Sequence, residues 1–254
     1  MLLERIYDED LAQAGYFIGC QAKNEAMVVD ARRDIREYLD LAARHGMTIT
    51  SVTETHIHAD YLSGTRELAE ATGATIYVSG EGGDDWQYGF SAERLHHGDQ
   101  LKLGNITVEA VHTPGHTADS ACFFVWSGKP GESTLEGIIT GDTIAGRHTT
   151  MISETDGDLG QYLDTLRLLE ERGQGITLLP GHGPEGEDIS AFARKYIDRR
   201  EHRLNQIRDV HSRLGEDVDL KTLIDEMYDD VDPVLRHAAE QSTRVALRYL
   251  AAQK

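Results

Sequence analysis

Short apolar runs and longer amphipathic segments alternate along this chain as far as residue 188. Runs rich in β-branched and aromatic residues predict strands at 16–20, 26–30, 49–54, 75–78, 106–111, 121–126, 137–140 and 176–179. Apolar side chains at helical spacing predict amphipathic helices at 35–45, 64–72 and 159–172. This alternation predicts a layered α/β fold.

The pattern changes at residue 189, because no further strand is expected after it. Three helices are predicted instead, at 192–214, 220–228 and 233–251. We therefore divide the chain into a catalytic domain, residues 1–188, and a helical C-terminal module, residues 189–254. The helical module is expected to pack on the first domain, framing its pocket, or to form a homodimer interface.

Histidines and aspartates gather where predicted strands end. His56, His58 and Asp60 follow the strand at 49–54 at alternate positions, which sends their side chains to the same side of an extended segment. Imidazole and carboxylate are ligands that Zn, Mn and Fe(II) accept. Taken alone, this spacing is equally compatible with helix caps and hydrogen-bonded histidines. Three more ligand-type residues directly follow a glycine near a strand end, and these are His116, Asp142 and His182.

This set of motifs, in this order, resembles the metallo-β-lactamase superfamily over about residues 10–185. The resemblance implies an αββα sandwich with a metal cleft at one sheet edge, to which this chain adds a C-terminal helical appendage. It also implies two metal sites, of which the first would use His56, His58 and His116 and the second Asp60, Asp142 and His182. Asp142 would bridge the two sites.

Tyr61 departs from the family pattern, because most members carry another histidine there. A phenol has a pKa near 10 and is a poor ligand near neutral pH, so the second site is expected to bind metal more weakly than the first. Asp60 and Tyr61 are the candidate catalytic residues, and the Tyr61 hydroxyl would hydrogen-bond the substrate or a bound water. The alternative is that the Tyr61 ring packs in the core.

The family resemblance differs between the two halves of the chain. The first hundred or so residues resemble persulfide dioxygenases, through segments 54–60, 63–64 and 66–69. Those enzymes hold one Fe(II) with two histidines and one carboxylate, which would be His56, His116 and Asp142. Residues 146–150 lack the arginine-rich, glutathione-contacting stretch expected of them. Together with residues 180–184 and the helical tail, they resemble the hydrolase branch.

Two functions therefore remain open. We favour a hydrolase that binds one or two divalent ions, Zn or Mn, and acts on a thioester, ester, lactone or phosphodiester. The alternative is a mononuclear Fe(II) dioxygenase that oxidises glutathione persulfide. A non-catalytic metal-binding protein is a minor alternative, because open metal positions are a catalytic arrangement.

The composition limits the classes of partner that the protein is expected to bind. The formal net charge is −19 and the pI about 4.9, which argues against electrostatic binding of nucleic acid or an anionic membrane. Residues 201–254 hold eight Lys or Arg against eleven Asp or Glu, a local charge of −3. No signal peptide or spanning segment is expected, so the chain is predicted to be cytoplasmic with a small-molecule substrate. Cys20 and Cys122 lie in apolar runs and are expected to be buried thiols.

Two smaller features bear on the site and the topology. Asp30 ends a predicted strand, where it would either accept hydrogen bonds from the histidine loop or cap a helix. Residues 96–99, His-His-Gly-Asp, predict a hairpin turn. His96 and His97 are adjacent and would point to opposite sides of an extended chain, so neither is expected to be a metal ligand.

Overall fold

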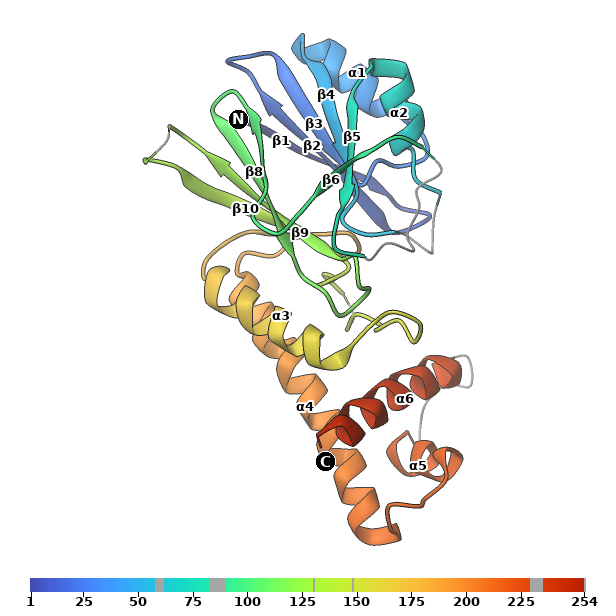
Figure 1. Cartoon of the computed structure of the whole chain (residues 1–254). Coiled ribbons are helices and arrows are strands. Elements are labelled where there is room, and N and C mark those ends of the chain that lie inside the picture. The colour runs from blue at the N-terminus through green and yellow to red at the C-terminus, as the bar shows by residue number, and fades with distance from the viewer. Residues whose placement is uncertain (58–61, 83–89, 130, 148, 229–234, 254) are drawn as a thin grey trace.

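The computed structural model describes residues 1–57, 62–82, 90–129, 131–147, 149–228 and 235–253 (Figure 1). In these residues two β-sheets face each other, with helices on their outer sides and a helical tail below. The predicted αββα sandwich with C-terminal helices is confirmed. None of the described helices is long and apolar enough to cross a membrane.

The first sheet is mixed. Its strands, in spatial order, are β1 (Leu2–Asp8), β2 (Gln13–Cys20), β3 (Glu25–Val29), β4 (Thr48–Thr53), β5 (Thr75–Ser79) and β6 (Glu93–Leu95). Strands β1 to β3 pair antiparallel, whereas β3 to β6 pair in parallel. Parallel neighbours need crossover connections, and α1 (Arg36–His45) and α2 (Thr65–Thr72) supply two of them on one face (Figure 1). Tyr38 and Leu68 anchor these helices in an apolar cluster with Phe17 and Val28.

The second sheet is mostly antiparallel. Its strands, in spatial order, are β11 (Leu178–Pro180), β10 (Thr134–Gly141), β9 (Ala121–Ser127), β8 (Ile106–His112) and β7 (Gln100–Leu103). Only β10 and β11 pair in parallel among these described strands. Helix α3 (Leu159–Arg172) covers the outer face, and its N-terminus is capped by Asp158, whose carboxylate accepts from Gln161 N at 2.8 Å.

The space between the sheets is filled by side chains that point inward from both. Tyr16 and Ile18 of β2 meet Phe123 and Val125 of β9 there, with Ile139 of β10, and all are buried. Cys20 and Cys122 are buried free thiols, as the sequence predicts. Because both sheets share this inner core, their strand ends are fixed relative to each other.

The helical tail consists of α4 (Ile189–Leu214), α5 (Leu220–Met227) and α6 (Arg236–Ala252). Helix α4 begins three residues earlier than the sequence predicts, because the Asp188 carboxylate caps it by accepting from Ser190 N at 3.1 Å.

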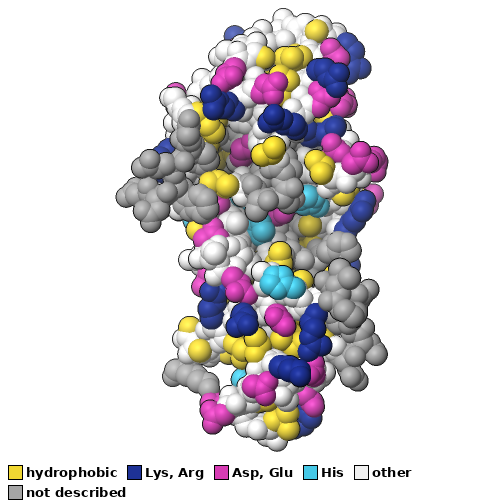
Figure 2. Space-filling view, turned by 90° about the vertical axis from the view of Figure 1, so that its right-hand side faces the viewer, with side chains coloured by type: hydrophobic (Ala, Val, Ile, Leu, Met, Phe, Trp, Pro, Cys, Tyr) yellow, Lys and Arg dark blue, Asp and Glu magenta, His cyan; other side chains and the backbone are white. Residues whose placement is uncertain are grey.

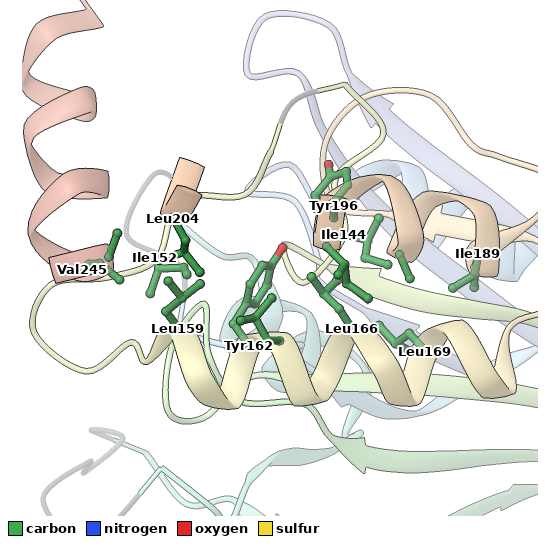
Figure 3. Close-up of a cluster of buried hydrophobic side chains, with 14 of the residues drawn as sticks. Ile144, Ile152, Leu159, Tyr162, Leu166, Leu169, Ile189, Tyr196, Leu204 and Val245 are labelled. Carbon is green, nitrogen blue, oxygen red and sulfur yellow. The ribbon is translucent and has the colours of Figure 1, made fainter. Parts of the chain in front are cut away.

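One apolar cluster runs from the second sheet through α3 into the tail. Figure 3 shows Tyr162 and Leu166 of α3 pointing toward Ile144 and toward Tyr196 of α4. The Tyr196 hydroxyl also donates to Ala145 O at 2.6 Å. The division at residue 188 therefore stays a prediction, although it coincides with the start of α4.

The hairpin predicted at residues 96–99 is wrong in its topology. A turn does form, since His96 N donates to the Asp99 carboxylate at 2.8 Å and Asp99 N donates to His96 O at 3.0 Å. However, β6 and β7 on either side of it belong to different sheets. The turn carries the chain from one layer to the other, because β6 pairs with β5 and β7 pairs with β8.

Candidate metal centre

The first histidine of the site is held by a buried hydrogen-bonded chain. Asp30 lies just beyond β3 with a left-handed backbone (φ 53°), and its carboxylate accepts from Thr55 N at 2.6 Å and Thr55 Oγ1 at 2.9 Å. The Thr55 hydroxyl lies 3.0 Å from His56 Nδ1. Because that hydroxyl donates to Asp30, it accepts from Nδ1–H, which leaves the His56 lone pair on Nε2. Asp30 therefore holds the histidine loop and caps no helix, since the N-cap of α1 is Ile35.

His116 reaches the site through a tight turn after β8. Gly115 has φ 131°, and a Cβ there would lie 2.4 Å from Tyr162 Cα, so the turn needs glycine. His116 Nδ1 lies 2.6 Å from Met151 O. A carbonyl only accepts, so Nδ1 carries the proton and, in neutral His116, Nε2 carries the lone pair.

Asp142 and His182 approach from the adjacent strands β10 and β11. The Asp142 carbonyl accepts from Thr150 Oγ1 at 2.6 Å, which fixes the backbone that carries the carboxylate. His182 Nδ1 lies 2.9 Å from Ala12 O and therefore donates to it. His182 Nε2 then faces Asp142 Oδ1 at 3.5 Å.

These side chains converge on one point at the ends of β4, β8, β10 and β11. One ligand atom from each of His56, His116 and Asp142 lies within 4.8 Å of the others. The His56 and His116 rings are nearly perpendicular, at 80°, with centroids 5.0 Å apart, and His116 Nε2 lies 3.9 Å from Asp142 Oδ2. Imidazole nitrogens thus lie opposite a carboxylate, which is a donor set that a divalent cation satisfies. A metal ion fits the residues that are present.

Three of the predicted site residues cannot be placed from the structure. His58, Asp60 and Tyr61 lie outside the described residues, so their roles stay predictions. His96 and His97 do not join the cluster; the His96 side chain is 59% exposed and pairs with Glu81 at 3.3 Å. Histidines lie along the middle of the face shown in Figure 2, between the sandwich above and the helical tail below.

One residue that supports the site has no counterpart in the sequence analysis. Asp119 is 1% exposed, and its Oδ2 accepts from Ile57 N at 2.8 Å, between His56 and His58. Burial raises the pKa of the Asp119 carboxyl. The available signal was a charged residue two positions before the apolar strand β9, where an unpaired carboxylate is costly.

The chain matches the family model of the metallo-beta-lactamase superfamily over residues 10–182. An atrochrysone carboxyl ACP thioesterase of Aspergillus fumigatus is 32% identical over 171 residues, which are 66% of this chain and 49%, or about half, of that protein. The beta-lactamase-like protein 2 homolog of Caenorhabditis elegans is 25% identical over 248 residues, which are 92% of this chain and 77% of that protein.

Solved structures agree with this assignment. A metallo-beta-lactamase of Staphylococcus aureus superposes with a TM-score of 0.70 at 29% identity, covering 96% of this chain and 70% of that one. ETHE1 of Myxococcus xanthus superposes with a TM-score of 0.67 at 23% identity, covering 96% of this chain and 99% of that one, and shows the shared fold. Because the family model matches well over half of the sequence and both sheets end at the expected ligand cluster, the chain belongs to the metallo-beta-lactamase superfamily.

Proposed function

We propose that the protein is a metal-dependent hydrolase for a small molecule with a thioester, ester, lactone or phosphodiester bond. The observation that carries the proposal is the convergence of His56, His116 and Asp142 from three separate strand ends, with His182 beside them. The similarity to a thioesterase over 66% of the chain supports hydrolysis.

The chain's own residues would hold and orient the metal. His56, His116 and Asp142 present ligand atoms within 4.8 Å of one another, and hydrogen bonds from the Nδ1 atoms fix both imidazoles. A divalent ion bound there would supply a Lewis acid and lower the pKa of a coordinated water to about 7. We further propose, from the sequence, that His58 joins this site, and that Asp60 and Tyr61 contact the water or the substrate.

His182 supports a hydrolase with a second metal position. Its Nε2 lies 3.5 Å from Asp142 Oδ1, on the side away from Ala12. The two oxygens of Asp142 face two different imidazoles, so Asp142 would help to hold an ion in either position, and a pair of ions would supply two-metal hydrolytic chemistry. We propose that Asp60 completes this second position and that it binds more weakly than the first.

A persulfide dioxygenase is the second candidate. Two histidines and one carboxylate are the facial set that non-haem Fe(II) oxygenases use, and the described cluster has that composition. The fold shared with ETHE1 is compatible with it. This candidate leaves His182 without a role in metal binding, which is why we place it second.

Assays of both reactions separate the candidates. The purified protein should hydrolyse at least one member of a panel of thioesters, esters, lactones and phosphodiesters. A chelator should abolish this activity, and Zn or Mn should restore it, because the nucleophile depends on the ion. The control is oxygen uptake with glutathione persulfide, which should stay at the rate without enzyme. Rapid persulfide-dependent oxygen uptake, with no turnover of the panel, would overturn the proposal.

A further inference from the structure

A cavity of about 920 Å³ lies in the helical tail, between the first half of α4 and the start of α6. Cationic side chains line it, namely Lys195, Arg199, Arg200 and Arg203, together with apolar Ala191 and Leu235. In the space-filling view, Lys and Arg side chains, interspersed with acidic ones, surround apolar side chains on the helical tail (Figure 2). The volume is in the range of sites that hold drug- or coenzyme-sized ligands, about 300–1,000 Å³.

The positive charge follows one face of α4. Lys195, Arg199 and Arg203 are spaced four residues apart, which places them next to one another along the helix. Like charges at this spacing destabilise a helix. Helix α4 carries seven Lys or Arg against three Asp or Glu, although the whole chain has a charge of −19. The charge of −3 for residues 201–254 does not reveal this basic face, because Lys195 and Arg199 precede residue 201.

Among the described residues, only part of this charge is paired with other protein groups. The side chains of Lys195 and Arg199 make no hydrogen bond or ion pair with a described residue, and Asp198 is the acidic side chain in the described lining. Arg203 lies 4.1 Å from the centroid of the Tyr228 ring, which orients its guanidinium. The sequence also holds aspartates at positions 229, 230 and 232, which lie outside the described residues.

The cavity adjoins the ligand cluster through one short segment. Thr149 lines the cavity, and Arg200 donates to Thr150 O. Thr150 Oγ1 in turn donates to Asp142 O, and the next carbonyl, Met151 O, accepts from His116 Nδ1. Two residues of chain span at most about 7 Å, so Thr149 at the cavity lies close to the Met151 carbonyl that holds His116.

We propose that this cavity binds the phosphate-bearing end of an amphipathic organic substrate, whose hydrolysable bond then lies at the metal centre. The inference rests on the proposed hydrolase function and specifies its substrate class. Guanidinium groups bind phosphate oxygens in a bidentate manner, and the apolar lining suits the organic part of the molecule. For a thioester, water adds its oxygen to the acyl carbon, the carbon–sulfur bond breaks, and the leaving sulfur takes a proton.

A binding experiment tests the cavity separately from catalysis. Titration calorimetry with inorganic pyrophosphate on the full chain should show a site that Lys195→Gln/Arg199→Gln weakens at least tenfold. The matched control, Arg208→Gln/Lys221→Gln, removes two exposed charges of the tail outside the cavity and should change the affinity less than twofold. Binding should also persist in His116→Ala, which removes a proposed metal ligand.

The proposal would be overturned if His116→Ala lost pyrophosphate binding while Lys195→Gln/Arg199→Gln kept it. That result would show that the phosphate binds at the metal centre. The proposal would also be overturned by a single-stranded RNA oligonucleotide that binds more tightly than pyrophosphate with steep salt dependence, since that indicates a polymer.

A pair of substrates tests whether the cavity positions the reacting bond. The acetyl thioester of coenzyme A carries phosphates, whereas that of N-acetylcysteamine carries none. The native protein should favour the first in kcat/KM by about tenfold or more, the variant Lys195→Gln/Arg199→Gln should lose that preference, and Arg208→Gln/Lys221→Gln should keep it. An equal fall of both kcat/KM values in the cavity variant contradicts the proposal. If neither thioester is turned over, only the proposed thioesterase activity is contradicted. The pyrophosphate titration then still tests whether the cavity binds phosphate.

Discussion

Replacing His116 with alanine is expected to abolish most of the activity and to release the metal. His116 contributes one of the three clustered ligand groups, and its Nδ1 is already fixed by Met151 O at 2.6 Å. Removing it deletes a ligand and leaves Asp142 with one fewer partner for the ion. We expect at least a 100-fold fall in kcat/KM, about 2.7 kcal/mol of transition-state stabilisation, with bound metal falling well below that of the native protein.

The matched control for this variant is His97→Ala. His97 is exposed and has no side-chain hydrogen bond with a described residue, so its loss should change activity and metal content by less than twofold. Melting curves of both variants separate loss of metal from loss of the fold. Full metal occupancy in His116→Ala, measured by mass spectrometry of the metal, would show that the ligand assignment is wrong.

Replacing Asp30 with alanine is expected to have the largest effect on stability among residues near the site. The change removes a buried acceptor of both Thr55 N and Thr55 Oγ1 and leaves these donors without it. Alanine must also adopt the left-handed backbone at φ 53°. Together these costs amount to about 3 kcal/mol of unfolding free energy, or a fall of about 10 °C in melting temperature.

Asp30→Asn distinguishes the two causes. Asparagine tolerates the left-handed conformation and keeps one oxygen acceptor, so it should lose less stability than alanine. Because Thr55 links Asp30 to His56, metal affinity should fall in both variants, by about 10- to 100-fold in alanine. Unchanged metal affinity in a folded Asp30→Ala protein would contradict the proposed link.

The layered fold was predictable because its signals are local. Buried strands are marked by β-branched runs, and Leu159–Arg172 shows helical spacing that the structure reproduces. The turn at residues 96–99 was also visible, but the sheets that its flanking strands join were not. Strand partners depend on contacts distant in sequence, such as β6 with β5, and a turn sequence carries no information about them.

The sequence predicted the metal ligands of the site better than the residues that hold those ligands in place. His116 and Asp142 are recognisable in the sequence because each follows a glycine at a strand end, and the structure brings both to His56. Asp119 is marked by no such motif. Its carboxylate accepts from Ile57 N only because the fold brings the residues before β9 next to the loop that carries His56. The basic face of α4 was missed for a different reason. The local charge was counted from residue 201, after Lys195 and Arg199, and the whole-chain charge of −19 hides so short a stripe.

The metal content of the protein, purified without added metal, tests the central claim most directly. Metal analysis by mass spectrometry should find one or two equivalents of Zn or Mn per chain, with little iron. Two equivalents are expected when metal is supplied in excess, because the second position at Asp142 and His182 is proposed to bind more weakly. A single equivalent of iron per chain, unchanged by excess Zn, would contradict the hydrolase and favour the Fe(II) dioxygenase.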